Sequence, residues 1–111
     1  MDLQPGENET FSKRANYSAG KRAVGGRLYV TDRRLVFEAH GFDKALGGKS
    51  VDVPLRDVTA VSVEPKGSFV KNLTSGGIRD RLRAEAGGTA HLFVVSPVAE
   101  VVEQVRRAAS L

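Results

Sequence analysis

The stretch Gly25–Glu38 constrains the fold of this chain more than any other. It contains the run Arg27–Val30 and all but the last residue of the run Arg34–Ala39. Both runs are rich in β-branched and aromatic residues, and such residues favour strands. A three-residue linker separates the runs. We expect Asp32 at its centre to carry the turn, because a short carboxylate accepts hydrogen bonds from nearby backbone N–H groups. We expect Gly25-Gly26 to let the chain bend sharply into the first strand. The stretch therefore predicts an antiparallel β-hairpin.

The rest of the chain predicts five more strands and one helix. Alternating or continuous apolar residues predict strands at Thr10–Asn16, Val51–Val53, Thr59–Val63, Ile78–Ala86 and Thr89–Val95. Turns are expected at Tyr17–Gly20, at Leu55–Val58 and at Gly87-Gly88. Pro54 predicts a strand end or a sheet edge, because proline cannot donate a backbone hydrogen bond to a neighbouring strand.

The last element is predicted to be a helix over about residues 97–109. Ser96 is a suitable N-cap and Pro97 suits the first helical position. An apolar stripe recurs at helical spacing, with Arg106 and Arg107 near the negative C-terminal end. The stripe consists of Val98, Val101, Val102 and Val105. Valine is a mediocre helix former, so we expect this helix to depend on docking against the sheet.

These elements predict a mainly β (α+β) domain, in which a curled antiparallel sheet of about seven strands is capped by one C-terminal α-helix. The length of 111 residues fits a single domain over residues 9–111. Residues 1–8 show no periodicity and are expected to form a flexible leader. Lys66–Gly77 is the longest irregular stretch, and loops of this length are typically functional or mobile.

The hairpin also resembles a known family. Ala15-Asn16 together with Ala23–Phe37 closely resembles the signature of GRAM domains, whose hairpin reads Gly-Gly-basic-Leu-aromatic-aliphatic-Thr-Asn/Asp-x-Arg-Leu-aliphatic-Phe. Val53–Val58 is similar to the family's Pro-Leu-x-x-Ile/Val segment, and Leu92–Val95 to its Phe-Val-Val strand. The resemblance covers roughly residues 9–109, although Lys66–Gly77 is longer than the family's usual link.

The resemblance implies a pleckstrin-homology-like split barrel, and a module that binds lipid or protein. It leaves the ligand undefined. The bias toward Arg, Ala, Gly and Val is typical of a GC-rich bacterial genome.

Positive charge is concentrated early in the chain. The net charge is +4, but residues 13–34 carry +6 and the remainder carries −2, which favours an anionic partner. We expect four basic residues around the turn at Tyr17–Gly20 to meet at one rim of the barrel, joined by a fifth from the next strand. These candidates for an anion or lipid site are Lys13, Arg14, Lys21, Arg22 and Arg27. In pleckstrin-homology-like domains this first loop is a common site for inositol phosphate head groups, as the resemblance implies. The alternative is a solvated basic face.

The sequence contains two further basic features, a group of three arginines and the single residue Arg34. Arg79, Arg81 and Arg83 share one face of a predicted strand, which is either a solvated face or, with Phe69 and Val70, a contact patch. Arg34 is expected to hold the hairpin through charge-assisted bonds, with Asp57 or Asp32 as its partner.

Enzymatic chemistry is not favoured. There is no cysteine, and the two histidines, His40 and His91, have too few potential partners for a metal or acid–base site. Gly47–Ser50 resembles the end of a phosphate-binding loop, but Asp43 stands where the motif requires its first glycine. We therefore expect no catalytic residues, no metal and no cofactor. The absence of a long apolar run and of a signal peptide favours a cytoplasmic location.

The leading hypothesis is a non-enzymatic GRAM-type module that binds an anionic membrane surface, a phospholipid head group or an acidic partner, which would place it peripherally at the membrane. The alternative is a protein-interaction module that uses an exposed strand edge at Val51–Pro54, without lipid binding. Nucleic acid is a weaker third candidate, because aromatic residues for base stacking are few. A monomer or a weak dimer is expected.

Overall fold

The computed structural model describes residues 1–19, 22–41, 50–65 and 80–111, with only the backbone of residues 19 and 22. Its strands are β1 (Glu9–Ala19), β2 (Arg22–Thr31), β3 (Arg34–Ala39), β4 (Val51–Pro54), β5 (Val58–Glu64), β6 (Arg81–Ala86) and β7 (Thr89–Val94). A short 3-10 helix, η1 (Leu55–Asp57), joins β4 to β5, and the chain ends in helix α3 (Val98–Ala108). β1 and β2 are longer than the strands predicted at residues 10–16 and 27–30. β6 corresponds to the strand predicted at 78–86, of which residues 78 and 79 lie outside the described residues.

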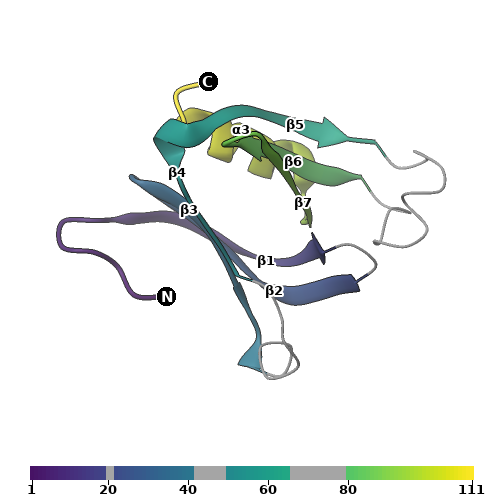
Figure 1. Cartoon of the computed structure of the whole chain (residues 1–111), viewed down its shortest axis with the longest axis horizontal. Coiled ribbons are helices and arrows are strands. Elements are labelled where there is room, and N and C mark those ends of the chain that lie inside the picture. The colour runs from purple at the N-terminus through teal and green to yellow at the C-terminus, as the bar shows by residue number, and fades with distance from the viewer. Residues whose placement is uncertain (20–21, 42–49, 66–79) are drawn as a thin grey trace.

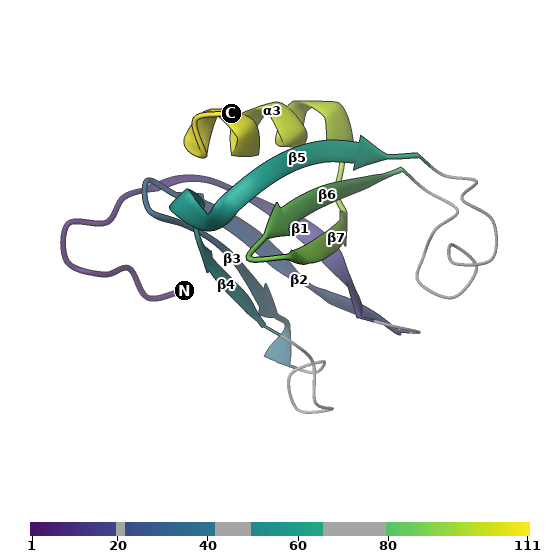
Figure 2. The same ribbon diagram turned by 45° about the horizontal axis from the view of Figure 1, so that its top comes forward.

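The strands form one antiparallel sheet in the order β4-β3-β2-β1-β7-β6-β5. The sheet curls so that β1–β4 and β5–β7 face each other, and α3 lies beside β5 and β6 (Figure 1). A view turned by 45° shows α3 running along one side of the curled sheet (Figure 2). The predicted fold class, a mainly antiparallel sheet capped by one C-terminal helix, is confirmed.

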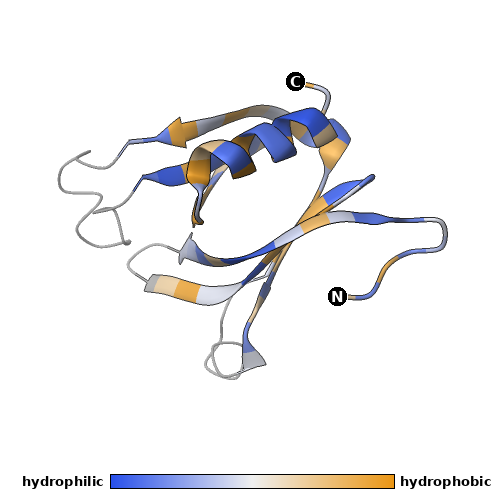
Figure 3. Ribbon diagram, turned by 180° about the vertical axis from the view of Figure 1, so that it is seen from behind, coloured by the Kyte–Doolittle hydropathy of each residue, from blue (hydrophilic) through white to orange (hydrophobic). Residues whose placement is uncertain are grey.

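The core lies between the two halves of the sheet and α3. The predicted valine stripe supplies the buried side of the helix, where Val101, Val102 and Val105 are buried and Val98 packs at the margin. The exposed side of α3 is mostly hydrophilic (Figure 3) and carries Glu100, Glu103, Gln104, Arg106 and Arg107. The largest fully buried side chains of the sheet are Phe37, Phe93, Leu28, Leu35 and Leu82. Burial of this apolar surface is the main stabilising contribution of such a fold.

Three aromatic rings join the two halves of the sheet. Tyr17 of β1 lies with its ring centroid 5.7 Å from that of Phe37 on β3 and 5.2 Å from that of Phe93 on β7. Phe37 and Phe93 are themselves 5.7 Å apart, and all three pairs are tilted, as aromatic pairs prefer. The prediction of a turn at Tyr17–Gly20 was wrong for Tyr17–Ala19, because β1 continues to Ala19. Tyr17 packs against the core from this strand.

The β2–β3 hairpin is confirmed, but Thr31 rather than Asp32 makes the side-chain bonds within its turn. The Thr31 hydroxyl oxygen accepts hydrogen bonds from the backbone N–H groups of Arg33 and Arg34, each at 3.0 Å. The carboxylate of Asp32 instead accepts from the backbone N–H of Asn8 at 2.9 Å. Asp32 therefore connects the turn to the N-terminal segment.

Gly26 has a different role from the expected bend. It lies within β2, opposite Ala39 of β3. A Cβ atom there would collide with the carbonyl oxygen of Glu38 and lie 2.7 Å from the Phe37 ring. Glycine is required because the neighbouring strand and the Phe37 ring pack directly against it.

The start of α3 also differs from the prediction. Helical geometry begins at Val98, and Pro97 rather than Ser96 occupies the N-cap position, with no side-chain cap hydrogen bond. The Gly87-Gly88 turn is confirmed, and both glycines have positive φ values, 58° and 81°, which glycine adopts without strain. The prediction of a long irregular stretch at Lys66–Gly77 lies outside the described residues.

Residues 1–8, expected to be a flexible leader, make defined contacts with the hairpin. The segment folds back on itself before β1 begins, so that the N-terminus lies on the side of the sheet (Figure 1). Glu7 is buried, and its backbone N–H donates to the carbonyl of Gln4 at 2.9 Å. The backbone of Asn8 exchanges hydrogen bonds with Asp32. The expectation of a leader did not include these contacts.

Candidate functional site

The described part of the predicted basic site lies on β1 and β2. Lys13, Arg14 and Arg27 are all exposed. In the β1–β2 register Arg14 stands directly opposite Arg27, and Lys13 stands opposite Leu28. Because side chains alternate along a strand, Arg14 and Arg27 share the outer face, whereas Lys13 leaves β1 on the other side. Two like charges directly opposite each other destabilise a strand pair.

Within the described ranges, no carboxylate forms an ion pair with Lys13, Arg14 or Arg27. The guanidinium of Arg27 donates through Nε to the hydroxyl of Ser12 at 3.1 Å, which leaves its full charge in place. This pattern differs from that of Arg34, Arg81 and Arg83, each of which is paired with an acid. The positive charge of this part of the sheet is therefore available to a ligand.

Lys13 and Arg14 do not lie at the rim of a first turn. Because β1 extends to Ala19, Lys13 and Arg14 lie in the middle of the strand, while Arg22 pairs with Ala19 at its far end. A spacing of five residues corresponds to about 17 Å at the usual strand rise. Lys21 and the side chain of Arg22 lie outside what the structure describes, so their part in the site stays a prediction.

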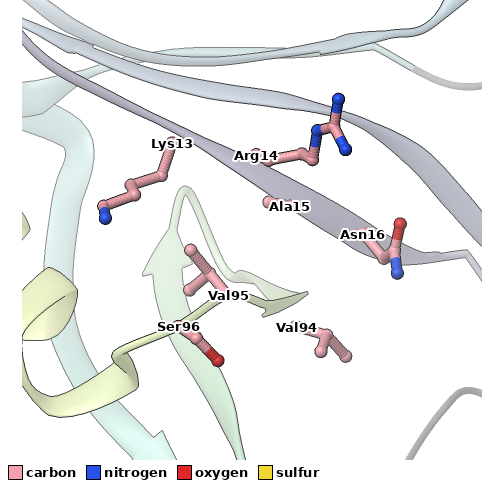
Figure 4. A pocket seen from close by; sticks show the side chains of 7 residues that line it. All are labelled: Lys13, Arg14, Ala15, Asn16, Val94, Val95 and Ser96. Atoms are coloured by element: carbon pink, nitrogen blue, oxygen red, sulfur yellow. The ribbon is translucent and has the colours of Figure 1, made fainter.

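A hollow of about 410 Å³ adjoins these residues, between β1 and the segment that links β7 to α3. Its lining consists of Lys13, Arg14, Ala15, Asn16, Val94, Val95 and Ser96. Figure 4 shows the Lys13 and Arg14 side chains leaving β1 in different directions, with Val95 and Ser96 on the other side of the hollow. The hollow thus combines two cations, an amide and a hydroxyl with an apolar side.

The second basic patch is largely neutralised where it is described. Arg81 is 2 % exposed and donates to Glu64 at 2.8 Å, and Arg83 donates to the other oxygen of Glu64 at 3.1 Å. Glu85 lies 3.7 Å from Arg83. Glu64 comes from β5, which pairs with β6, so the alternation within β6 alone could not reveal it. Arg79 lies outside the described residues.

Arg34 makes the charge-assisted bonds expected of it, but with other partners. Its Nε and Nη2 atoms donate to the two carboxylate oxygens of Glu7 at 2.7 and 2.9 Å, and Nη1 donates to Asp52 at 2.8 Å. The expected partners, Asp57 and Asp32, were wrong. The Glu7 side chain also accepts from the Thr31 hydroxyl at 2.7 Å.

The hydrogen bonds from Arg34, together with those from Thr31 and the Gln4 backbone, lower the pKa of Glu7 to about 2, against the opposing effect of burial. The pKa of Arg34 is raised, chiefly by its bonds to Glu7. This network fastens the N-terminal segment to the hairpin and to β4, so Arg34 has a structural role.

Of the two histidines, His91 has an aromatic neighbour. The ring of His91 contacts Tyr17, with 3.2 Å between Nδ1 and the phenol oxygen. Burial lowers the pKa of His91 and raises that of Tyr17. Within the part of the chain that the structure describes, no group of three or more histidine and acidic side chains could hold a metal ion. No helix there is long and apolar enough to cross a membrane.

Sequence reasoning missed Asn16, Ser96 and Ser12, which line the hollow or bind Arg27. A signal was present for Asn16, because it belongs to the Ala15-Asn16 block of the family resemblance. Ser96 was interpreted only as a helix cap. Its position across the hollow from β1 depends on where β7 leaves the sheet, which local sequence does not specify.

The sequence matches no family model and no curated protein. Solved structures do resemble the fold. The C-terminal domain of an unknown protein from Leishmania infantum has a TM-score of 0.70 with 11% identity, covering 96% of this chain and 88% of that one. The Vps36 N-terminal PH domain has a TM-score of 0.67 with 18% identity, covering 98% of this chain and 83% of that one. The fold is pleckstrin-homology-like. At these identities the likeness concerns the fold alone, and membership of the GRAM family stays a prediction.

Proposed function

We propose that this pleckstrin-homology-like domain is a non-enzymatic binding module that holds an anionic group on the basic surface of β1 and β2. The surface consists of Arg14 and Arg27 on the outer face of the two strands, and we name it the β1–β2 basic surface. Lys13 lies on the opposite face of β1 and lines the neighbouring hollow. The anionic group belongs to a phospholipid head group at a membrane surface or to an acidic partner. In the first case the domain acts peripherally at the membrane, and a cytoplasmic location is part of the proposal.

The observation that carries the proposal is the opposition of Arg14 and Arg27 across the β1–β2 register, with no acid paired to either among the described residues. A bound phosphate or carboxylate would relieve this repulsion and accept charge-assisted hydrogen bonds from both guanidinium groups. The neighbouring hollow adds Lys13, the Asn16 amide and the Ser96 hydroxyl within the same region. Positive charge of this kind contributes about 1 kcal/mol per residue near an anionic membrane.

The alternative, a protein-interaction module that uses the β4 edge, has one observation in its favour, since β4 is an edge strand of the sheet. However, β4 contains four residues and ends in Pro54, which limits backbone pairing. Nucleic-acid binding is disfavoured further by the burial of Phe37 and Phe93 and the partial burial of Tyr17, because these rings are not exposed for base stacking.

The test is co-sedimentation with vesicles that contain one fifth phosphatidylserine, together with titration of soluble inositol hexakisphosphate followed by backbone amide NMR. The double variant Arg14→Ser/Arg27→Ser should lose about 2 kcal/mol of binding free energy, or roughly 30-fold in affinity. The matched control is Arg56→Ser/Arg107→Ser, which removes the same charge from two exposed positions elsewhere.

We expect the control to retain most of the binding. Equal loss in both double variants would show that only net charge matters and would contradict the proposed site. No binding of either probe by the wild-type domain would contradict an anionic phosphate ligand.

A further inference from the structure

The seam between β1 and β7 is the feature that carries a further inference. β1 pairs with β2 from Glu9 to Ala19, but it pairs with β7 only at Asn16 and Tyr17. β7 ends at Val94, and the chain then leaves the sheet to begin α3. Among the residues that the structure describes, the side of β1 that faces β7 therefore has no neighbouring strand before Asn16.

The backbone groups that face this seam can be identified from the register. The backbone N–H of His40 donates to the carbonyl of Gly25, so Gly25 directs its backbone groups toward β3. In antiparallel strands such groups alternate from residue to residue, and residues opposite each other in a non-bonded pair point away from each other. Asn16 is opposite Gly25 and therefore points toward β7.

By the same alternation, Arg14 and Ser12 direct their N–H and C=O groups into the seam. Neither has a strand partner on that side within the described residues. Unpaired backbone groups of a strand are a template for pairing with another chain.

The other two edges of the sheet are less open to such pairing. On β5 the carbonyl of Val61 accepts a hydrogen bond from Arg106 of α3 at 3.4 Å, so the helix covers part of that edge. On β4, Val51 and Val53 direct their backbone groups toward Phe37 and Leu35 of β3. The backbone groups of Asp52 and Pro54 therefore face outward. Pro54 has no N–H to offer there.

The seam also has the charge and the space for a particular occupant. The hollow of about 410 Å³ opens at Lys13–Asn16, where β7 stops pairing (Figure 4). Lys13 and Arg14 flank the strand on its two faces, and neither is ion-paired among the residues described. An extended segment in this position would therefore have cations beside both of its side-chain rows.

We propose that the seam binds an extended acidic peptide segment of a partner protein, which adds to β1 beside Ser12–Ala15 and continues the ladder that β7 leaves. Its backbone bonds to Ser12 and Arg14, and its carboxylates lie beside Lys13 and Arg14. This inference rests on the proposed function, because it names the carrier of the anionic group. A membrane surface would use the charges but not the backbone groups of the seam.

The test uses the wild-type domain and a blocked octapeptide of alternating glutamate and threonine. The same peptide is also prepared with N-methyl groups on every glutamate or on every threonine, which removes alternate backbone donors at constant charge. Binding is followed by amide NMR and by hydrogen exchange of the Ser12 and Arg14 amides. Inositol hexakisphosphate and phosphatidylserine vesicles serve as non-peptide anions.

We expect the unmodified peptide to shift the amides of residues 12–16 and 94–96 and to slow exchange at Ser12 and Arg14 at least tenfold. One N-methylated form should bind at least tenfold more weakly and the other about as well as the unmodified peptide, because only alternate amides face β1.

Equal binding of all three peptides would overturn strand addition while leaving charge recognition, and with it the proposed function, in place. A second outcome would also overturn strand addition and keep the proposed function: the non-peptide anions bind, their binding depends on Arg14 and Arg27, and the peptide does not bind. It would assign the anion to a membrane or a free phosphate. Failure of every probe would overturn both proposals.

Discussion

Single residues hold the N-terminal segment and the hairpin together. The side chain of Glu7 is fully buried and shares its two carboxylate oxygens between Arg34 and Thr31. Arg34 in turn reaches Asp52 of β4 and the backbone carbonyl of Asp2. Removing one member of a buried ion pair is costly, because the other charge is left without compensation.

This network predicts a dependence of stability on pH. The pKa of Glu7 is about 2 in the folded chain, below its usual 4.5, so its contribution to the free energy of unfolding is present above pH 4.5 and is lost as the pH falls toward 2. The variant Glu7→Gln should be less stable than the wild type at pH 7 and should lack this part of the pH dependence. Urea denaturation followed by circular dichroism between pH 2 and pH 7 measures both effects.

The control is Glu103→Gln, since Glu103 is exposed on α3. It should follow the wild-type curve. A parallel curve for Glu7→Gln, with the same loss at every pH, would show that Glu7 does not cause the acid sensitivity.

Gly26 is a second decisive residue, because its neighbours leave no room for a methyl group. Gly26→Ala should lower the free energy of unfolding by about 1–3 kcal/mol, the usual cost of overpacking. Gly41→Ala is the control, since no described residue lies within 4 Å of a Cβ atom there. Thermal denaturation of both variants decides the point, and an unchanged midpoint for Gly26→Ala would contradict the packing argument.

At the scale of elements, helix α3 depends on its docked face. Its valines are poor helix formers, and Val101 and Val105 are fully buried against the sheet. The hydrophobic pattern of this helix was readable from the sequence, because residues at i, i+3, i+4 and i+7 share one face. Its starting residue was not readable, since Pro97 takes the cap position without any side-chain bond.

Val105→Ala should therefore lower the free energy of unfolding by about 2 kcal/mol, from the lost burial of two methyl groups and the cavity that they leave. Gln104→Ala, at an exposed neighbouring position, should change it little or raise it slightly, because alanine is the better helix former. Urea denaturation of both proteins checks the difference. Equal stability would mean that the helix is not held by its valine face.

At the scale of the whole molecule, side chains rather than backbone hydrogen bonds close the sheet. β1 and β7 share only two residue pairs, whereas the rings of Tyr17, Phe37 and Phe93 pack together across the same junction. The two halves of the sheet should therefore unfold as one unit that depends on this aromatic cluster.

Phe93→Ala should lower the free energy of unfolding by about 3–5 kcal/mol, because the fully buried ring leaves a cavity between the halves. Unfolding should stay a single transition by circular dichroism and by tyrosine fluorescence. Two separate transitions in the wild type would show that the halves fold independently and would contradict a common core.

The basic surface illustrates how the site was only partly predictable. The charge excess of residues 13–34 is a property of the sequence itself, and most of these residues lie on β1 and β2. The position of each charge relative to the others follows from strand length and register. Tyr17 extends β1 into the core, which moved Lys13 and Arg14 to the middle of the strand and brought Arg14 opposite Arg27.

The sequence by itself determined the approximate positions of the strands along the chain, the turn at Gly87-Gly88, the closing helix and its apolar face, because these depend on local propensity and periodicity. Only the tertiary structure decided that Glu7 pairs with Arg34, that Glu64 neutralises Arg81 and Arg83, and that β7 stops short along β1. These contacts join residues far apart in the chain, and their geometry is set by the curl of the sheet and the packing of its core. No local pattern records them.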